Sequence, residues 1–355
     1  MKLFGKMKHK LRILSVIFSL ALIGCDSTEN KVVEGFELKG EAQGTTYTII
    51  IAEEILNISK TEIDSILKVF DTSLSTYVPT SHISQLNASE KRYHFYDVGG
   101  FFRTCYTNSL AVFEETKGSF DPSVFPLIEG WGFFKKMDTP LEQSEIDSLL
   151  TFVSFEPGRH HQMNVANDSI YFSKSDARFK LDFNAIAQGQ SIDVLYEFIR
   201  KKGHTNFYIE LGGELRVSGK NREGVKWKVG IDTPSESNSG EDGRSISGIL
   251  NLENKAVATS GNYRNFYEKD GRKFAHTLDP KTGYPVTHSL LSATVITDEC
   301  SIADAFATAF MVVGLEESKK LIKSSQYELE VVLIYENKAG KLEYYISSGA
   351  QKMFE

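Results

Sequence analysis

The sequence predicts a single α+β domain in which a mixed, largely antiparallel sheet packs against helices. The chain has 355 residues, of which 41% are hydrophobic and 25% charged, as is typical of a globular protein with a sizeable core. Strand-like and helix-like patterns follow one another without regular strand–helix–strand alternation, and short glycine turns join neighbouring strands. We therefore expect one functional unit, at residues 40–355.

The first 24 residues predict a lipoprotein signal peptide. Basic residues up to Arg12 precede the apolar stretch 13–23, which is too short to span a bilayer comfortably. Leu22-Ile23-Gly24-Cys25 then resembles the bacterial lipobox, although a hydrophobic stretch with a chance cysteine is the alternative. We expect Cys25 to carry acyl chains such as palmitate, and residues 25–39 to include a polar tether. The mature protein is then expected as an extracytoplasmic, membrane-anchored lipoprotein, at the periplasmic face of the inner membrane if Asp26 acts as a retention signal.

Charge and cysteine content exclude some classes of protein. The formal net charge is −7, and the signal segment contributes only positive charge, so the mature part is more acidic still. An acidic body argues against nucleic acid as the main partner. Cys105 and Cys300 remain after Cys25, and their separation leaves open whether they form a bridge or are buried singly.

The N-terminal half of the domain predicts one strand and three helices. Residues 45–51 are rich in β-branched side chains and follow a turn at Gln43-Gly44, which predicts a strand. Residues 59–70 carry apolar side chains at helical spacing behind a Ser59/Glu62 capping pair. Further helices are expected at 100–117 and 142–151, with a break at 120–123 between them.

The C-terminal half predicts the rest of the sheet. A helix at 186–202 is expected to end at Gly203. Gly-Gly and Gly-Lys-Asn turns between the next strands favour antiparallel pairing. The polar stretch 234–245 indicates a mobile surface loop. The expected strands are 169–172, 180–183, 207–211, 215–217, 226–231, 247–258 and 290–297, followed by a helix at 301–313 and a closing pair of strands.

The residues that could carry chemistry match no common nucleotide or hydrolase signature: the P-loop, Rossmann, nucleophile-elbow and zincin patterns are absent from the sequence. Asp304 and Thr308 lie four residues apart, on one face of the expected helix, where two oxygen ligands could hold a hard cation. The alternative is structural, because Ser301 followed by Asp304 is also typical of a capping box.

Two further clusters each have a functional and a structural interpretation. His276 precedes the polar turn Asp279-Pro280-Lys281-Thr282-Gly283, with Ser260 and Arg264 upstream, and could act as an acid/base group, although a lone histidine is more often structural. Residues 181–193 place small side chains between an expected strand and a helix N-terminus, which suits phosphate but also suits a tight turn. Gly212-Gly213 is most simply a hairpin turn.

The mature chain carries short motifs in a fixed order: Gly44-Thr45-Thr46-Tyr47, Ser75-Thr76-Tyr77 with Pro79, Phe120-Asp121-Pro122, Leu181-Asp182 through Asp193, Leu211-Gly212-Gly213, Ala258-Thr259-Ser260-Gly261, His276 through Pro285 and Ala303-Asp304 through Thr308. Taken together and in this order, these motifs resemble the ApbE family, whose members are FAD:protein FMN transferases. The resemblance covers about residues 40–335, nearly the whole mature chain, and implies an ApbE-like fold for the domain at 40–355.

The resemblance implies an enzyme that binds FAD and Mg²⁺, transfers FMN to a threonine hydroxyl of a target protein as a phosphoester, and releases AMP. By the resemblance, the metal site maps to the Ala185 carbonyl, the Asp304 carboxylate and Thr308. His276 is our candidate for taking the threonine proton, with Asp279 orienting it or the metal site. Flavin and adenine contacts map to Gln43, Tyr77, Ser119, Phe120, Asp121, Asp182, Gln188, His276 and Thr277. Two positions depart from the family pattern: Gln188 stands where many members have Lys, and Glu210 where many have Asn.

Three functions remain open at this level. The first is the transferase, whose implied acceptors are flavin-bearing subunits of membrane redox complexes, such as the Na⁺-translocating NADH:quinone reductase and Rnf-type complexes. The second is an Mg²⁺-dependent FAD pyrophosphatase, in which water replaces threonine. The third is a flavin-binding lipoprotein without catalysis, which tight FAD binding without AMP release would indicate.

Overall fold

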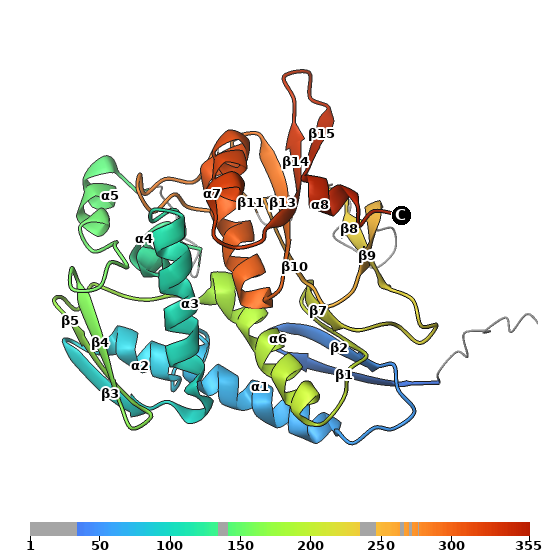
Figure 1. Ribbon diagram of the computed structural model, residues 1–355. Coiled ribbons are helices and arrows are strands. Elements are labelled where there is room, and N and C mark those ends of the chain that lie inside the picture. Colours follow the sequence, from blue (N-terminus) through green and yellow to red (C-terminus); the bar gives the residue numbers. More distant parts are fainter. Residues whose placement is uncertain (1–33, 134–140, 235–245, 263–265, 270–271, 276) are drawn as a thin grey trace, which may run out of the picture. The chain divides into compact units, whose positions relative to one another are not determined.

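An eight-stranded sheet forms the centre of the fold, and each pair of neighbouring strands in it is antiparallel. The computed structural model describes residues 34–133, 141–234, 246–262, 266–269, 272–275 and 277–355 (Figure 1). In spatial order the strands are β1 (Phe36–Ala42), β2 (Thr45–Ile51), β6 (Phe207–Leu211), β7 (Glu214–Ser218), β10 (Ala256–Gly261), β13 (Leu290–Thr297), β14 (Glu330–Glu336) and β15 (Leu342–Ile346).

Helices and three small sheets surround this sheet. The small sheets are β3 (Arg92–Tyr96), β5 (Ser169–Lys174) and β4 (His161–Ala166); β8 (Trp227–Asp232) and β9 (Ile246–Leu252); and β11 (Phe266–Lys269) and β12 (Arg272–Ala275). The helices are α1 (Lys60–Leu74), α2 (His82–Ala88), α3 (Phe101–Glu115), α4 (Phe125–Gly130), α5 (Gln143–Leu150), α6 (Asn184–Lys201), α7 (Cys300–Ser324) and α8 (Ser348–Gln351), with short 3₁₀ turns at Val98–Gly100 and Pro122–Val124.

The two faces of the large sheet bury different partners because side chains alternate along each strand. In β2, Tyr47, Ile49 and Ile51 pack in one cluster with α1 and α6. Ile50 and Ala52 belong to another cluster, on the β8–β9 side. Figure 1 shows the same division, with the long helices on one side of the sheet and the β8–β9 hairpin on the other.

The α+β class and the large antiparallel sheet are confirmed. Residues Val32–Glu355 form one compact unit, and β1 begins at Phe36, before the boundary expected at residue 40. The capping box at Ser59 and Glu62 is present at the start of α1. Gly203 follows α6 with φ 95°, a left-handed conformation that glycine adopts without strain.

The strand expected at 180–183 is wrong, because the backbone hydrogen bonds of this segment go elsewhere. The side chain of Asn87 accepts from the N–H of Leu181 and donates to its carbonyl, both at 2.8 Å. The N–H of Asp182 donates to the carbonyl of Pro122 at 2.7 Å. An asparagine side chain and a loop thus take the place of a neighbouring strand.

Two expectations about strand pairing also need correction. The expected strand 247–258 is divided into β9 and β10, which belong to different sheets and are separated by Asn254, with φ 53°. β8 pairs with β9 instead of continuing the run of β6 and β7.

The helix expected at 301–313 extends to Ser324, although Gly314 interrupts it with φ 75°.

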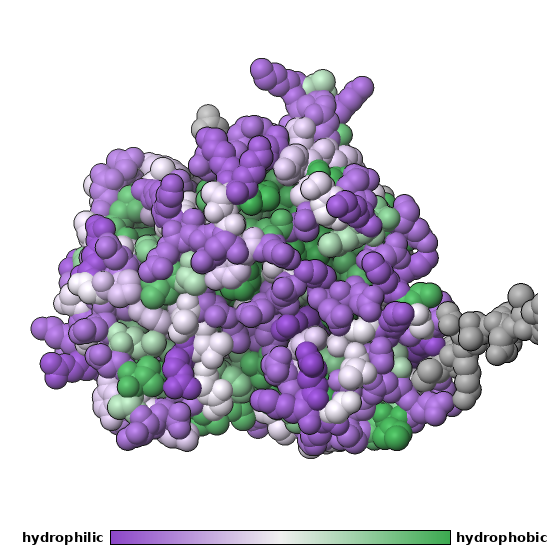
Figure 2. Space-filling model, in the orientation of Figure 1, coloured by the Kyte–Doolittle hydropathy of each residue, from purple (hydrophilic) through white to green (hydrophobic). Residues whose placement is uncertain are grey.

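Some expectations fall outside the described residues: the signal peptide, Cys25, almost all of the loop at 234–245, and His276. Within the described part, no helix is long and apolar enough to cross a membrane. Cys105 and Cys300 are both buried as free thiols, so they do not bridge. Hydrophilic side chains cover most of the face shown in Figure 2, with smaller apolar areas between them.

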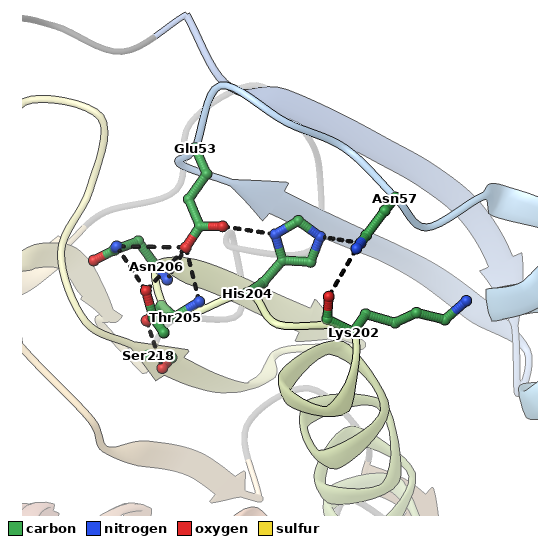
Figure 3. Close-up of polar contacts among 7 residues, drawn as sticks. All are labelled: Glu53, Asn57, Lys202, His204, Thr205, Asn206 and Ser218. Carbon is green, nitrogen blue, oxygen red and sulfur yellow. Dashed lines mark hydrogen bonds and ion pairs between the residues drawn. The ribbon is translucent and has the colours of Figure 1, made fainter.

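A polar network around the buried His204 joins the C-terminal end of α6 to the chain that follows β2 (Figure 3). The carboxylate of Glu53 contacts Nδ1 of His204 at 2.7 Å, and Nε2 of His204 contacts the Asn57 side chain at 2.6 Å. Asn57 donates in turn to the carbonyl of Lys202 at 2.7 Å. Burial would raise the pKa of Glu53, but hydrogen bonds from Thr205 and His204 lower it overall. This network stabilises α6 at its C-terminal end.

Candidate active site

α6 and α7 cross near their N-terminal ends, where Gly189 of α6 contacts Cys300 of α7. A Cβ atom at this position would lie 2.4 Å from the carbonyl oxygen of Cys300, so any larger residue would push the helices apart. Glycine is therefore required here by a close backbone approach. Of the small residues at 181–193, Gly189 is therefore explained by close packing between two helices.

Asp304 lies in this crossing as a buried carboxylate, with 6% of the residue exposed. Its Oδ2 accepts from the N–H of Gly189 at 3.1 Å. Burial raises the pKa of Asp304 to about 7, against the lowering effect of the Gly189 N–H, and the negative charge of Asp193 adds to the rise. Among the described residues, no lysine or arginine forms an ion pair with it. A bound cation would relieve the cost of this buried charge.

The capping-box interpretation of Asp304 is wrong. α7 starts at Cys300 behind Glu299, so Ser301 lies inside the helix. The Ser301 hydroxyl accepts from the Asn108 side chain at 3.2 Å, and the Asp304 carboxylate contacts α6 instead of its own helix start.

The residues expected to hold a metal offer oxygen ligands from both helices. In a regular helix the N–H of Gly189 donates to the carbonyl of Ala185, but here it also has Asp304 as an acceptor. Thr308 lies one turn after Asp304, and its hydroxyl contacts that of Ser260, at the end of β10, at 3.2 Å. A carbonyl, a carboxylate and a hydroxyl suit Mg²⁺, which favours oxygen. Within the described residues, no three His, Cys, Asp or Glu side chains gather as a metal cluster.

Asp182 and Tyr77 lie beside the start of α6. The buried carboxylate of Asp182 accepts from the backbone N–H of Asn184 at 2.7 Å, and burial raises its pKa to about 6. The Asn184 side chain donates to Thr76 at 3.2 Å and so links this turn to the segment of Tyr77. Tyr77 is 73% exposed, and partial desolvation of its hydroxyl, together with the charge of Asp182, raises its pKa. An exposed aromatic ring can stack on a flavin or an adenine.

The expected contacts at 119–121 divide between fold and site. Phe120 is 3% exposed and belongs to the core. Asp121 accepts from the N–H of Ser123 at 2.8 Å and caps the following 3₁₀ turn, and burial raises its pKa to about 6. Ser119 accepts from the ammonium group of Lys281 at 3.1 Å. The sequence did not single out this lysine.

Lys281 joins the turn at 279–283 to Ser119. Asp279 accepts from the backbone N–H of Lys281 at 2.9 Å, which shapes the turn. Thr277 donates to the Asn262 side chain at 2.7 Å. His276 itself lies outside the described residues, so its position is not part of this geometry.

Gln43 and Gln188 each lie where a hairpin turn of the sheet approaches α6. Gln43 has φ 54° in the β1–β2 turn, and its side chain accepts from the Ser191 hydroxyl at 3.4 Å. The amide nitrogen of Gln188 lies so close to Gly212 that a Cβ there would be 2.2 Å away. Gly212 and Gly213 form the expected β6–β7 turn, both with positive φ.

The raised pKa of Asp182 predicts a pH-dependent stability. Folded Asp182 keeps its proton up to about pH 6, whereas the unfolded carboxyl releases it near pH 4, so the folded state loses stability as the pH rises through this window. Asp182→Asn cannot ionise. Wild type therefore loses stability between pH 5 and pH 8 from this group, and the variant does not. The stability of the variant relative to wild type should be about 1 kcal/mol greater at pH 8 than at pH 5. Urea denaturation without FAD measures this difference, and equal values at both pH values would contradict it.

Comparisons with a family model and with individual proteins point to the same family. A family model described as the ApbE family matches residues 43–333. A protein of Vibrio cholerae serotype O1 named FAD:protein FMN transferase is 32% identical over 342 residues, covering 93% of this chain and 95% of that protein. A protein of Haemophilus influenzae with the same name is 30% identical, with 91% of each chain covered.

Solved structures show the same similarity. The flavin transferase ApbE from Vibrio cholerae has a TM-score of 0.77 at 29% identity, covering 90% of this chain and 99% of that one. The apo flavinyl transferase ApbE of Pseudomonas stutzeri has a TM-score of 0.77 at 26% identity, with 90% and 97% covered. The similarity therefore extends over nearly the full length of these relatives.

Proposed function

Because this chain belongs to the ApbE family and is an FAD:protein FMN transferase, we propose that its transfer reaction requires Mg²⁺ and that its acceptor is a threonine hydroxyl. The threonine oxygen attacks the FMN-side phosphorus of FAD. The bond from this phosphorus to the bridging oxygen breaks, and AMP leaves with that oxygen. The products are a protein phosphoester and AMP.

The metal proposal rests on the buried carboxylate of Asp304. This carboxylate accepts a hydrogen bond from the N–H of Gly189, and burial raises its pKa. We assign the metal site to Asp304, Thr308 and the carbonyl of Ala185. When bound, the cation neutralises the pyrophosphate charge that otherwise repels a nucleophile and stabilises the departing AMP phosphate.

We assign the remaining roles from the family resemblance, together with the chemistry of each side chain. His276 takes the threonine proton as general base, and Asp279 orients this histidine or the metal site. Tyr77 and Asp182 contact FAD beside α6, and Ser119 contacts it beside Lys281. Gln43, Gln188 and Thr277 complete the proposed FAD contacts. The side chains of Phe120 and Asp121 are buried, so these two residues would contact FAD through their backbone. Gln188 is neutral, so at this position the protein supplies no positive charge to the phosphates of FAD.

Chelation and acceptor mapping test the proposal. After EDTA treatment the purified chain should transfer no FMN, and added Mg²⁺ should restore transfer. Fragment masses of the acceptor should place FMN on a threonine, and an acceptor with that threonine changed to valine should stay unmodified. Transfer that survives EDTA would overturn the metal assignment, whereas FMN on another residue type would overturn the threonine assignment.

We further propose that Cys25 is lipidated and that the acceptors are flavin-bearing subunits of membrane redox complexes, such as the Na⁺-translocating NADH:quinone reductase or Rnf-type complexes. The support is the basic and apolar signal segment that directly precedes Cys25. A lipid anchor at the periplasmic face of the inner membrane would place the enzyme beside such acceptors. Distribution of the chain between membrane and soluble fractions tests the anchor.

A further inference from the structure

Two residues of α6 form hydrogen bonds to the N-terminal part of α7. Gly189 and Asp193 are four residues apart and so lie on one face of α6. Gly189 donates its N–H to Asp304 at 3.1 Å. The carboxylate of Asp193 accepts from the N–H of Cys300 and from that of Ser301, each at 2.9 Å. Glu299, which precedes α7, makes no side-chain cap of its own, so the cap is supplied by α6.

Arg216 connects this cap to the large sheet. It lies on β7, and its Nη1 contacts Oδ1 of Asp193 at 2.7 Å, with side chains 14% and 10% exposed. Its guanidinium carbon lies 3.8 Å from the ring centroid of Tyr196, which is also on α6. The buried pair of Asp193 and Arg216 therefore joins β7, α6 and the start of α7.

The register of α7 decides where Asp304 lies. Asp304 follows Ser301 by three residues, so a shift of the capped turn would move its carboxylate away from Gly189. The close contact of Gly189 with Cys300 leaves little room for α7 to settle elsewhere. Groups behind a metal ligand commonly set its orientation, and their loss costs about 10- to 100-fold in metal affinity.

We propose that the Asp193–Arg216 pair is a positioning device for the metal site, holding α7 so that Asp304 faces Gly189 near the start of α6. This inference rests on the proposed metal dependence. Asp193 and Arg216 do not contact substrate in this role. They act through Asp304.

Binding of Mn²⁺ to the full-length chain without FAD tests the inference independently of activity. Mn²⁺ serves as a probe for the Mg²⁺ site, and calorimetry gives its affinity. Asp193→Asn should weaken binding about tenfold or more. Arg216→Lys, which keeps the positive charge but loses the planar fork, should weaken it less.

The network of Figure 3 offers a matched control at the other end of the same helix. Glu53→Gln also removes a carboxylate, here the one that contacts His204, whose side chain is only 4% exposed. It should lower the thermal midpoint yet leave Mn²⁺ affinity within about threefold of wild type. This separates positioning of the metal site from general stabilisation of α6.

Each outcome has a distinct meaning. Weaker binding in Asp193→Asn but not in Glu53→Gln supports the inference. Equal affinities in all variants, or equal losses in both Asp193→Asn and Glu53→Gln, overturn it while the proposed function stands. If wild type binds no Mn²⁺, the proposed metal dependence fails, and the inference fails with it. Should Asp193→Asn not fold, Arg216→Lys decides: unchanged affinity in this variant overturns the inference.

Discussion

Asp304→Asn should abolish FMN transfer, with a loss of about a thousandfold or more. The substitution keeps the size of the side chain but removes the charge that we assign to cation binding. The variant should still fold, because the wild-type carboxylate is buried, has a raised pKa and forms no ion pair among the described residues. Its free energy of unfolding at pH 8 without metal should equal or exceed that of wild type. Intact mass of the acceptor and urea denaturation measure the two effects.

Glu316→Gln is the control for this substitution. Glu316 lies on the same helix, but its side chain is 77% exposed and pairs with Lys319. We expect full transfer activity from this variant. If Asp304→Asn kept more than about a tenth of wild-type transfer, the metal site would have to lie elsewhere.

His276→Ala should lower the rate of transfer by about 100- to 10,000-fold, which is the range for loss of a general base. A threonine hydroxyl is a weak nucleophile, so its proton must be taken as the bond to phosphorus forms. FAD binding should change much less, because a base acts mainly in the transition state. Single-turnover transfer and FAD fluorescence titration measure these two quantities separately.

His94→Ala provides a histidine control. His94 is exposed and stacks on Tyr171, on the outer face of the β3–β5–β4 sheet. It should transfer FMN at the wild-type rate. An unchanged rate in His276→Ala would remove His276 from the mechanism, and an equal loss of FAD affinity and rate would make it a binding residue instead.

The sequence predicted elements well where local signals determine them. Strand 45–51 and the helix that starts after Ser59 have β-branched content or a capping box within their own residues. The segment 180–183 has the same alternating pattern as a strand, but Asn87, far away in sequence, takes its backbone hydrogen bonds. Pairing of β8 with β9 likewise depends on long-range packing that no local pattern encodes.

The candidate site was predictable in part for the same reason. The spacing of Asp304 and Thr308 suggested oxygen ligands on one helix face, and the family resemblance added Ala185. Spacing alone could not separate a ligand from a helix cap, because that depends on the contact between Asp304 and Gly189 across two helices. The cap supplied by Asp193 is invisible in the sequence because it joins residues 107 and 108 positions apart.

The most direct test is the intact mass of a flavin-acceptor domain after incubation with FAD, Mg²⁺ and the purified chain. We predict a gain equal to one esterified FMN, with one AMP released for each acceptor modified. Release of AMP and free FMN with an unmodified acceptor would instead indicate an FAD pyrophosphatase. FAD that stays bound and intact would indicate a flavin-binding protein and contradict the proposed chemistry at Asp304.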